Sequence, residues 1–102
     1  MTEHFVLLKC RPGHEPELDG ALARFETEIR RLEAVIEITS GRNFNRGADE
    51  RGWTHGMLVR LPLPADLPAY WDHPAHQRLV EVLERTCTDR FAVDYETDKE
   101  PQ

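Results

Sequence analysis

Apolar residues recur along two stretches of the chain with the three- and four-residue spacing of an amphipathic helix. The first helix is predicted over residues 15–33, and its apolar stripe consists of Leu18, Leu22, Phe25, Ile29 and Leu32. The second is predicted over residues 74–86, with Pro74 at its first position and a cap from Asp72 or His73. Its apolar face consists of His76, Leu79, Val80, Leu83 and Cys87. We therefore expect two long helices, each with one buried side.

Four runs of strand length lie before, between and after these helices. They cover residues 4–10, 35–39 with an extension toward residue 44, 53–61 and 91–95. The polar, glycine-containing residues 43–52 predict a loop, and residues 65–71 predict a short helix. The order β-α-β-β-α-β, with one small extra helix, predicts an α+β fold of the ferredoxin-like type. In that fold a four-stranded antiparallel sheet carries its helices on one face.

Two of the predicted strands are apolar at consecutive positions, residues 5–8 and residues 57–59. Because successive side chains of a strand point to opposite faces, both faces of these strands must be buried. The two long helices can cover only one face, and a chain of 102 residues has nothing left for the other. We therefore predict a homodimer in which two sheets pack face to face as a dimeric α+β barrel.

Composition agrees with a small single domain, which we expect to cover residues 1–97, with residues 98–102 as a flexible tail. The net charge is −6 and the 13 cations are scattered, which argues against nucleic acid or an anionic membrane as a partner. No apolar run approaches the roughly 20 residues of a membrane helix, and the N-terminal residues lack the features of a signal peptide. Cys10 and Cys87 fit small buried residues in a reducing compartment, so we expect a cytoplasmic location.

His76 lies in the first turn of the last predicted helix, on its apolar side, and is expected to point inward. Such a histidine either bonds a backbone carbonyl at the edge of the core or acts as a general acid/base, because a partly buried imidazole titrates near neutral pH. Tyr70, on the short helix before it, supplies a phenol that either packs or orients a substrate oxygen. His76 and Tyr70 are the candidate catalytic residues.

His4 and Asp94 lie on the first and last predicted strands, which are neighbours in this topology. A carboxylate beside an imidazole fixes its tautomer and favours its charged form, although the pair can also serve as a structural hydrogen bond between strands. His55 shares a predicted strand face with Trp53, where it either lines a cavity or packs in the barrel. These four residues are the candidate pocket and substrate-binding residues.

Nothing in the sequence favours a metal or a cofactor. His73 and His76 are three residues apart, but His73 is better explained as a helix cap, and no cysteine or glutamate lies at the spacing of a metal motif. The sequence also lacks the motifs of nucleotide binding and of acyl-enzyme chemistry. A small-molecule ligand or substrate remains the expected partner beside a second copy of the chain.

Five segments resemble, in order, the stress-responsive dimeric α/β-barrel (Dabb) domain family. They are residues 4–9, 41–43, 53–56, 70–76 with a His-Pro-Ala-His core, and 93–95. The resemblance implies the dimeric barrel fold. Within the family, the chain is similar to the olivetolic acid cyclase type of polyketide cyclase, a cofactor-free enzyme that closes a ring in a linear polyketide by an aldol reaction.

This resemblance also implies roles for individual residues. Tyr70 and His76 match the catalytic pair of that cyclase, and His4 and Asp94 match residues that line its pocket. His55 matches the strand histidine of its Tyr-Thr-His motif. Trp53 stands where that enzyme has tyrosine, so the resemblance does not identify the substrate of this chain.

Three functions therefore compete. The first is a small cofactor-free enzyme, a cyclase, lyase or isomerase that acts on a carbonyl compound through Tyr70 and His76. The second is a non-catalytic stress-response or ligand-binding dimer, and the third is a haem-binding or monooxygenase-type barrel. Uptake of haem by the purified protein would separate the third from the others. One open cavity shared by Tyr70 and His76 would favour the first.

Overall fold

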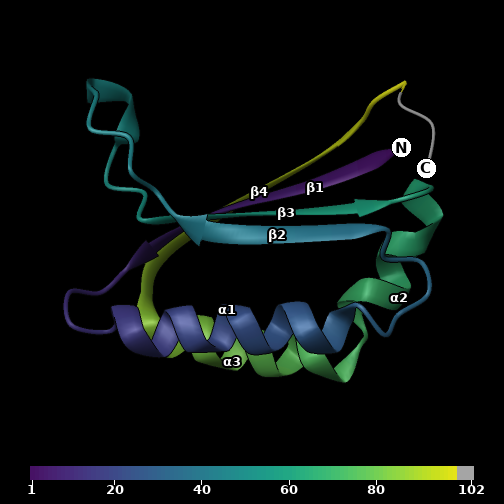
Figure 1. Ribbon diagram of the computed structural model, residues 1–102, viewed down its shortest axis with the longest axis horizontal. Coiled ribbons are helices and arrows are strands. Elements are labelled where there is room, and N and C mark those ends of the chain that lie inside the picture. Colours follow the sequence, from purple (N-terminus) through teal and green to yellow (C-terminus); the bar gives the residue numbers. More distant parts are fainter. Residues whose placement is uncertain (99–102) are drawn as a thin grey trace.

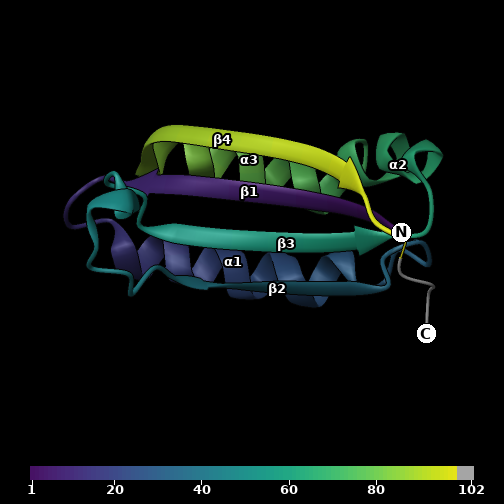
Figure 2. The ribbon, with the colours of Figure 1, turned by 90° about the horizontal axis from the view of Figure 1, so that it is seen from above.

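The computed structural model describes residues 1–98, which form one antiparallel sheet with helices on a single face (Figure 1). The elements are β1 (Thr2–Cys10), α1 (Glu15–Ile29), β2 (Glu37–Arg42), β3 (His55–Leu61), α2 (Leu67–Trp71), α3 (Pro74–Thr86) and β4 (Cys87–Glu96). The strands lie in the order β2-β3-β1-β4, above α1 and α3 (Figure 2). The predicted ferredoxin-like α+β fold is confirmed. Of the predicted tail, only Asp98 lies within the described residues.

Strand β1 occupies the middle of the sheet and pairs with β3 on one side and β4 on the other. His4 lies opposite Val59 of β3 and opposite Asp94 of β4. Cross-strand partners in an antiparallel sheet share a face. The inner face, toward the helices, therefore carries the even-numbered residues of β1 together with the odd-numbered residues of β3.

Several predicted boundaries differ from those observed. Helix α1 ends at Ile29 rather than residue 33. Beyond Ile29 the chain turns back toward the sheet, with backbone hydrogen bonds between residues three positions apart, such as the one from Leu32 N–H to the Ile29 carbonyl at 3.0 Å. Strand β4 begins at Cys87, four positions before the predicted start at residue 91, directly after α3. Strands β2 and β3 begin at Glu37 and His55, each two residues after the predicted start.

Helix α3 has the predicted bounds, and its first turn shows why. Pro74 stands at the start, and His73 is the cap: its Nδ1 accepts a hydrogen bond from the Ala75 N–H at 3.0 Å. An N-cap acceptor satisfies a backbone donor that has no partner within the helix. This bond also holds the His73 ring at the helix end.

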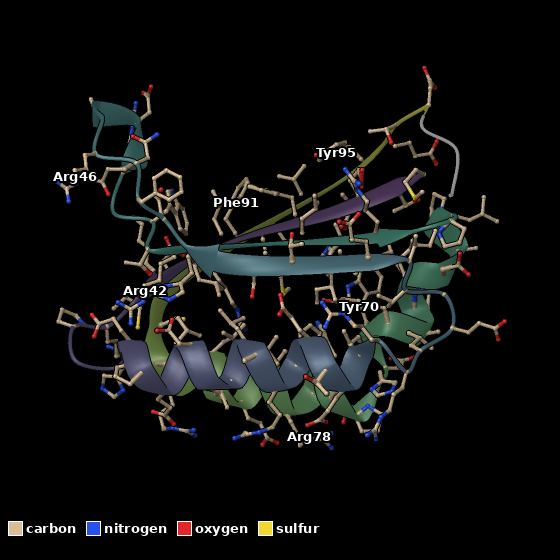
Figure 3. All side chains as sticks on the ribbon, in the orientation of Figure 1. Arg42, Arg46, Tyr70, Arg78, Phe91 and Tyr95 are labelled. Atoms are coloured by element: carbon tan, nitrogen blue, oxygen red, sulfur yellow. The ribbon has the colours of Figure 1, made fainter. Side chains whose placement is uncertain are left out.

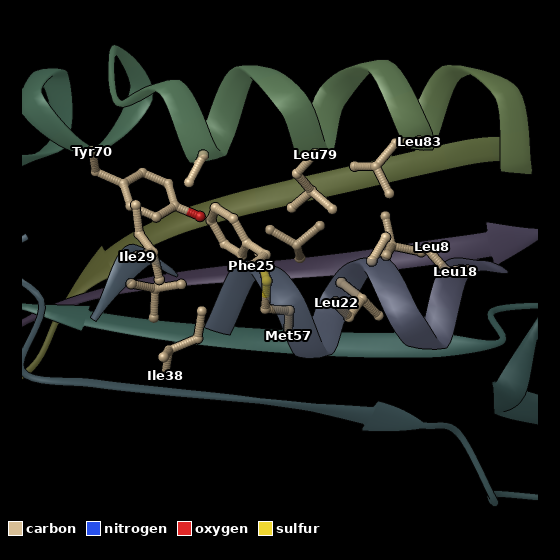
Figure 4. Packing of buried hydrophobic residues seen from close by; sticks show 14 of the residues in the cluster. Leu8, Leu18, Leu22, Phe25, Ile29, Ile38, Met57, Tyr70, Leu79 and Leu83 are labelled. Atoms are coloured by element: carbon tan, nitrogen blue, oxygen red, sulfur yellow. The ribbon is translucent and has the colours of Figure 1, made fainter. Parts of the chain in front are cut away.

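The hydrophobic core fills the layer between the helices and the sheet (Figure 4). Leu18, Ile29, Ile38, Val59 and Leu61 are almost completely buried within it. Full burial of one such side chain stabilises a fold by about 1.5–3 kcal/mol. The core therefore binds the helical layer firmly to the inner face of the sheet.

Within residues 1–98, none of α1, α2 and α3 covers the outer face of the sheet (Figure 1). Phe91, Val93 and Tyr95 of β4 are 52%, 40% and 46% exposed, although their side chains are apolar or aromatic. Figure 3 shows Phe91 and Tyr95 on the side away from the helices. The loop between β2 and β3 rises on this same side and carries Phe44, which is 93% exposed. The outer face is thus an uncovered apolar surface.

The two cysteines are buried, as predicted, and both are free. They also lie opposite each other, since Cys10 at the end of β1 pairs in register with Cys87 at the start of β4. Burial raises the pKa of both thiols, so each stays protonated near neutral pH. Across the described residues, no helix combines the length and apolar character needed to cross a membrane.

Candidate active site

A cavity of about 370 Å³ opens between the inner face of β1 and β4 and the helices α2 and α3. Its walls are mostly apolar and include Val6, Met57, Leu79, Val80, Leu83 and Ala92. Its polar lining groups come from four elements and are His4, Tyr70, His76 and Arg90. Apolar walls with a few convergent polar groups are typical of small-molecule sites.

Tyr70 is the most deeply buried of the polar lining residues, with an exposed fraction of 0%. Helix α2 places it there because Leu67 and Tyr70, three residues apart, share the buried side of this short helix. The ring points into the layer between helices and sheet, beside Phe25 (Figure 4). Its hydroxyl has no hydrogen-bond partner among residues 1–98. A buried donor without a partner costs about 1–3 kcal/mol, so this hydroxyl has hydrogen-bonding capacity that the described residues leave unused.

His76 stands next to Tyr70, with ring centroids 5.0 Å apart and an angle of 63° between the planes. It projects from the first turn of α3 and is half-buried. Burial lowers the pKa of His76, and the nearby His4 and Arg90 lower it further, against an opposing backbone hydrogen bond at Trp71. The imidazole is therefore neutral at pH 7, the form that accepts a proton.

Burial acts on the phenol in the direction that keeps its proton. It raises the pKa of Tyr70 well above the usual value of 10, and the negative charge of Asp94 adds to this effect. Tyr70 thus remains a hydrogen-bond donor throughout the physiological pH range. A neutral base and a protonated donor stand side by side in one cavity.

His4 is oriented by Asp94 from the neighbouring strand. His4 Nδ1 lies 2.5 Å from Asp94 Oδ1, and the His4 ring lies 5.2 Å from that of Tyr70. This bond fixes the ring with Nδ1 toward the carboxylate, so Nε2 is the nitrogen left for a ligand. Asp94 itself does not line the cavity and acts on it only through His4 and its charge.

The structure places the other two predicted pocket residues away from this cavity. The ring of His55 is 1% exposed and lies between two partners: Asp19 Oδ1 at 2.7 Å from Nε2 and Thr54 Oγ1 at 2.8 Å from Nδ1. Trp53 packs against Phe91, with Lys9 Nζ 4.7 Å from its ring centroid. Both border a separate hollow of about 580 Å³, which the β2–β3 loop forms with the outer face.

The expectation that Trp53 and His55 share a face is wrong, because His55 bonds Asp19 of α1 on the inner face whereas Trp53 packs on Phe91 of the outer face. The hollow that they border lies over the apolar surface described above and contains neither Tyr70 nor His76. We therefore take the 370 Å³ cavity as the candidate active site.

The sequence interpretation did not include Trp71 or Arg90 among the pocket residues. Both line the cavity: Trp71 is 42% exposed, and Arg90 lies on β4. Strand alternation could have found Arg90, which shares its face with Ala92 and Asp94. The predicted strand began one residue too late to include it. Over residues 1–98, no cluster of three or more histidine, cysteine or carboxylate side chains is arranged to bind a metal.

Comparison with known proteins gives the same fold and a family. The model of the "Stress responsive A/B Barrel Domain" family matches residues 2–97. A stress-response A/B barrel domain-containing protein of Arabidopsis thaliana is 28% identical over 102 residues, which are 99% of this chain and 38% of that protein. The chain thus spans well under half the length of this relative.

Two solved structures are similar along nearly their whole length. A dimeric ferredoxin-like protein of unknown function from Jannaschia sp. CCS1 has a TM-score of 0.85 and 25% identity, covering 94% of this chain and 98% of that one. Hydroxynitrile lyase from Passiflora edulis has a TM-score of 0.81 and 14% identity, covering 98% and 96%. At this identity the lyase shares the fold alone.

Tyr70→Phe tests whether the hydroxyl lacks a partner inside the protein. We expect the free energy of unfolding to stay unchanged or to rise, by up to about 1–3 kcal/mol, because the variant removes an unsatisfied buried donor. The matched control is Thr86→Val, since the buried Thr86 Oγ1 donates to the Val82 carbonyl at 2.8 Å and its loss costs about 1 kcal/mol. Urea denaturation of both variants measures the difference. A clear loss of stability in Tyr70→Phe would show that the hydroxyl does have a hydrogen-bond partner inside the protein.

His76 gives a pH dependence with a defined sign. Its folded-state pKa lies below the unfolded value near 6.5, so the folded protein binds this proton less readily than the unfolded chain. The free energy of unfolding should therefore fall as the pH is lowered through 6.5 toward the folded pKa. In His76→Gln this contribution should vanish. NMR titration of the imidazole gives the pKa directly, and a midpoint at or above 6.5 would overturn the assignment.

Proposed function

This chain belongs to the stress-responsive A/B barrel domain family, and we propose that it is a cofactor-independent enzyme that moves a proton next to a carbonyl group. In this proposal His76 is the general base and acid, and Tyr70 is the donor to the carbonyl oxygen. His4, held by Asp94, lines the same cavity and orients the substrate. The reaction class is that of a cyclase, lyase or isomerase.

The proposed step balances without an oxidant or a reductant. The neutral imidazole of His76 takes a proton from the carbon next to a carbonyl, and the electron pair moves onto the carbonyl oxygen. The Tyr70 hydroxyl donates to that oxygen as its charge develops. The enolate carbon then attacks a second carbonyl of the same molecule, a carbon–carbon bond forms, and the resulting alkoxide recovers the proton from His76.

The observation that carries the proposal is the unpartnered Tyr70 hydroxyl beside a neutral His76 in a mostly apolar cavity. A structural tyrosine would be expected to have a partner for its hydroxyl, because burial without one is costly. Catalysis needs the opposite, a donor that waits for charge on the substrate. The lowered pKa of His76 supports the role of base at neutral pH.

Ring closure of a polyketide-like substrate is the specific reaction that we favour within this class. Its basis is the resemblance to the olivetolic acid cyclase type, in which the residues matching Tyr70 and His76 are catalytic. A cavity of about 370 Å³ lies toward the small end of ligand pockets, roughly 300–1,000 Å³, and suits a small substrate. If the exchange test below fails while ligands still bind, the chain is a ligand-binding dimer.

We also propose that the working unit is a homodimer. The outer face exposes Phe91, Val93 and Tyr95, and β1 adds the half-buried Phe5 and Leu7. A contiguous exposed apolar surface on a small protein marks an interaction site. A second copy is the occupant that we favour, because related proteins of this fold, including the one from Jannaschia, are described as dimeric.

Val93→Glu tests the dimer by placing a charge in the apolar surface. Wild-type protein should elute from size-exclusion chromatography with a light-scattering mass of about twice 11.8 kDa, and the variant as a monomer or an unfolded chain. Circular dichroism separates these two results. The control Ala23→Glu places the same charge on the exposed side of α1 and should remain dimeric. A wild-type monomer at micromolar concentration would rule out the barrel.

Hydrogen–deuterium exchange at carbon tests the chemistry before the substrate is known. Acyl thioesters and 1,3-dicarbonyl compounds are incubated with the protein in D₂O, and deuterium uptake next to the carbonyl is followed by mass spectrometry. His76→Ala should slow the catalysed exchange by about 10²–10⁴-fold, and Tyr70→Phe by about 10²–10³-fold. The double variant should be barely slower than His76→Ala, because both residues serve one step.

The surface variant His14→Ala is the control for loss of a histidine, and it should exchange at the wild-type rate. Equal exchange by wild type and His76→Ala would contradict the assignment of the base. If none of the probe compounds takes up deuterium although all variants are folded, the proposed function is contradicted.

A further inference from the structure

Arg90 gives the cavity a charge that the proposed chemistry does not use. It lies on β4 opposite Leu8 of β1, on the face that also carries Ala92 and Asp94. Within the described part of the chain, it is the only arginine or lysine that lines this cavity. The other walls are apolar apart from the two histidines and Tyr70.

Among residues 1–98, no carboxylate lies within hydrogen-bond distance of the positively charged Arg90 guanidinium. Its nearest carboxylate is Glu84 Oε1, 3.8 Å away, with side chains 45% and 68% exposed. By contrast, Arg60 Nε lies 2.9 Å from the buried Glu3, and Arg42 and Arg85 each hold a carboxylate at 2.5 Å. A loose pair between exposed groups contributes little, so Arg90 is available to another anion.

The position of Arg90 also fits a ligand that reaches inward. Its charge is close enough to His76 to help lower the pKa of that imidazole. The chain as a whole carries a net charge of −6, so a weakly paired cation at this cavity stands out. Arg90 thus marks one end of a mostly apolar space whose other end holds Tyr70.

We propose that Arg90 selects an anionic substrate, a small organic carboxylate with an apolar body. The carboxylate binds the guanidinium, which presents paired N–H donors that match its two oxygens. The apolar body lies along Leu79, Val80 and Leu83, and the reacting carbonyl meets Tyr70. This substrate class rests on the proposed function for its reacting end and on Arg90 for its charge.

Matched acid and amide probes test this selection without knowledge of the true substrate. Binding of 4-phenylbutyrate and of 4-phenylbutyramide is measured by isothermal titration calorimetry. Wild type should prefer the acid, and Arg90→Gln should weaken binding of the acid about 10- to 100-fold while changing binding of the amide little. Arg90→Lys should retain part of the preference, because it keeps the charge and loses the paired donors.

Arg78→Gln is the matched control. Arg78 pairs with Glu28 on the helical side away from the sheet (Figure 3) and does not line the cavity. This variant should bind both probes as wild type does. The acid should also raise the NMR-measured pKa of His76 in wild type, and by less in Arg90→Gln, because its charge offsets that of Arg90.

Two outcomes would overturn the inference: equal affinity of wild type for acid and amide, or an unchanged preference in Arg90→Gln. Neither result depends on catalysis. Failure of the proposed function appears instead as the absence of carbon-bound deuterium exchange in wild type. The two failures are therefore distinguishable in the same set of proteins.

Discussion

Strand β1 carries apolar side chains on both faces of the sheet, while α1 and α3 cover only one of them. Val6 and Leu8 point toward the helices and are buried, whereas Phe5 and Leu7 point the other way and are half-buried. The inward side becomes the core and the candidate site. The outward side becomes the surface that a second copy is proposed to cover. One alternation of side chains along β1 thus assigns two roles to adjacent residues.

Helices and strands with a periodic apolar pattern could be predicted from the sequence. Boundaries that are set by contacts between distant parts of the chain could not. Helix α3 has the predicted bounds because Pro74 and the His73 cap act locally. The predicted start of β4 was wrong because it depends on pairing with the distant β1. The predicted end of α1 was wrong because local turn hydrogen bonds end the helix although its apolar stripe continues to Leu32. Residues 87–90 have no strand-like run of apolar side chains, and only their ladder with β1 makes them extended.

The candidate site shows the same division. His4, Tyr70 and His76 come together as expected, since helix spacing and strand order place them on facing surfaces. Trp53 was placed on the wrong face because strand alternation was extended to residues before His55. The bond between His55 and Asp19 had no signal in the sequence, because Asp19 lies on α1. The missing partner of Tyr70 Oη had no signal in the sequence, because an unpaired atom is a property of the packed interior.

The bond between His4 and Asp94 joins positions 90 residues apart in the sequence. Closing so long a loop has a high entropic cost, which later contacts must repay before the state is populated. Helices α1 and α3 can form from near neighbours, but the cavity exists only once β4 has paired with β1. A chain with intact helices and an undocked last strand would have no site. The presence of the cavity therefore reports that folding is complete, because residues of β4 form one of its walls.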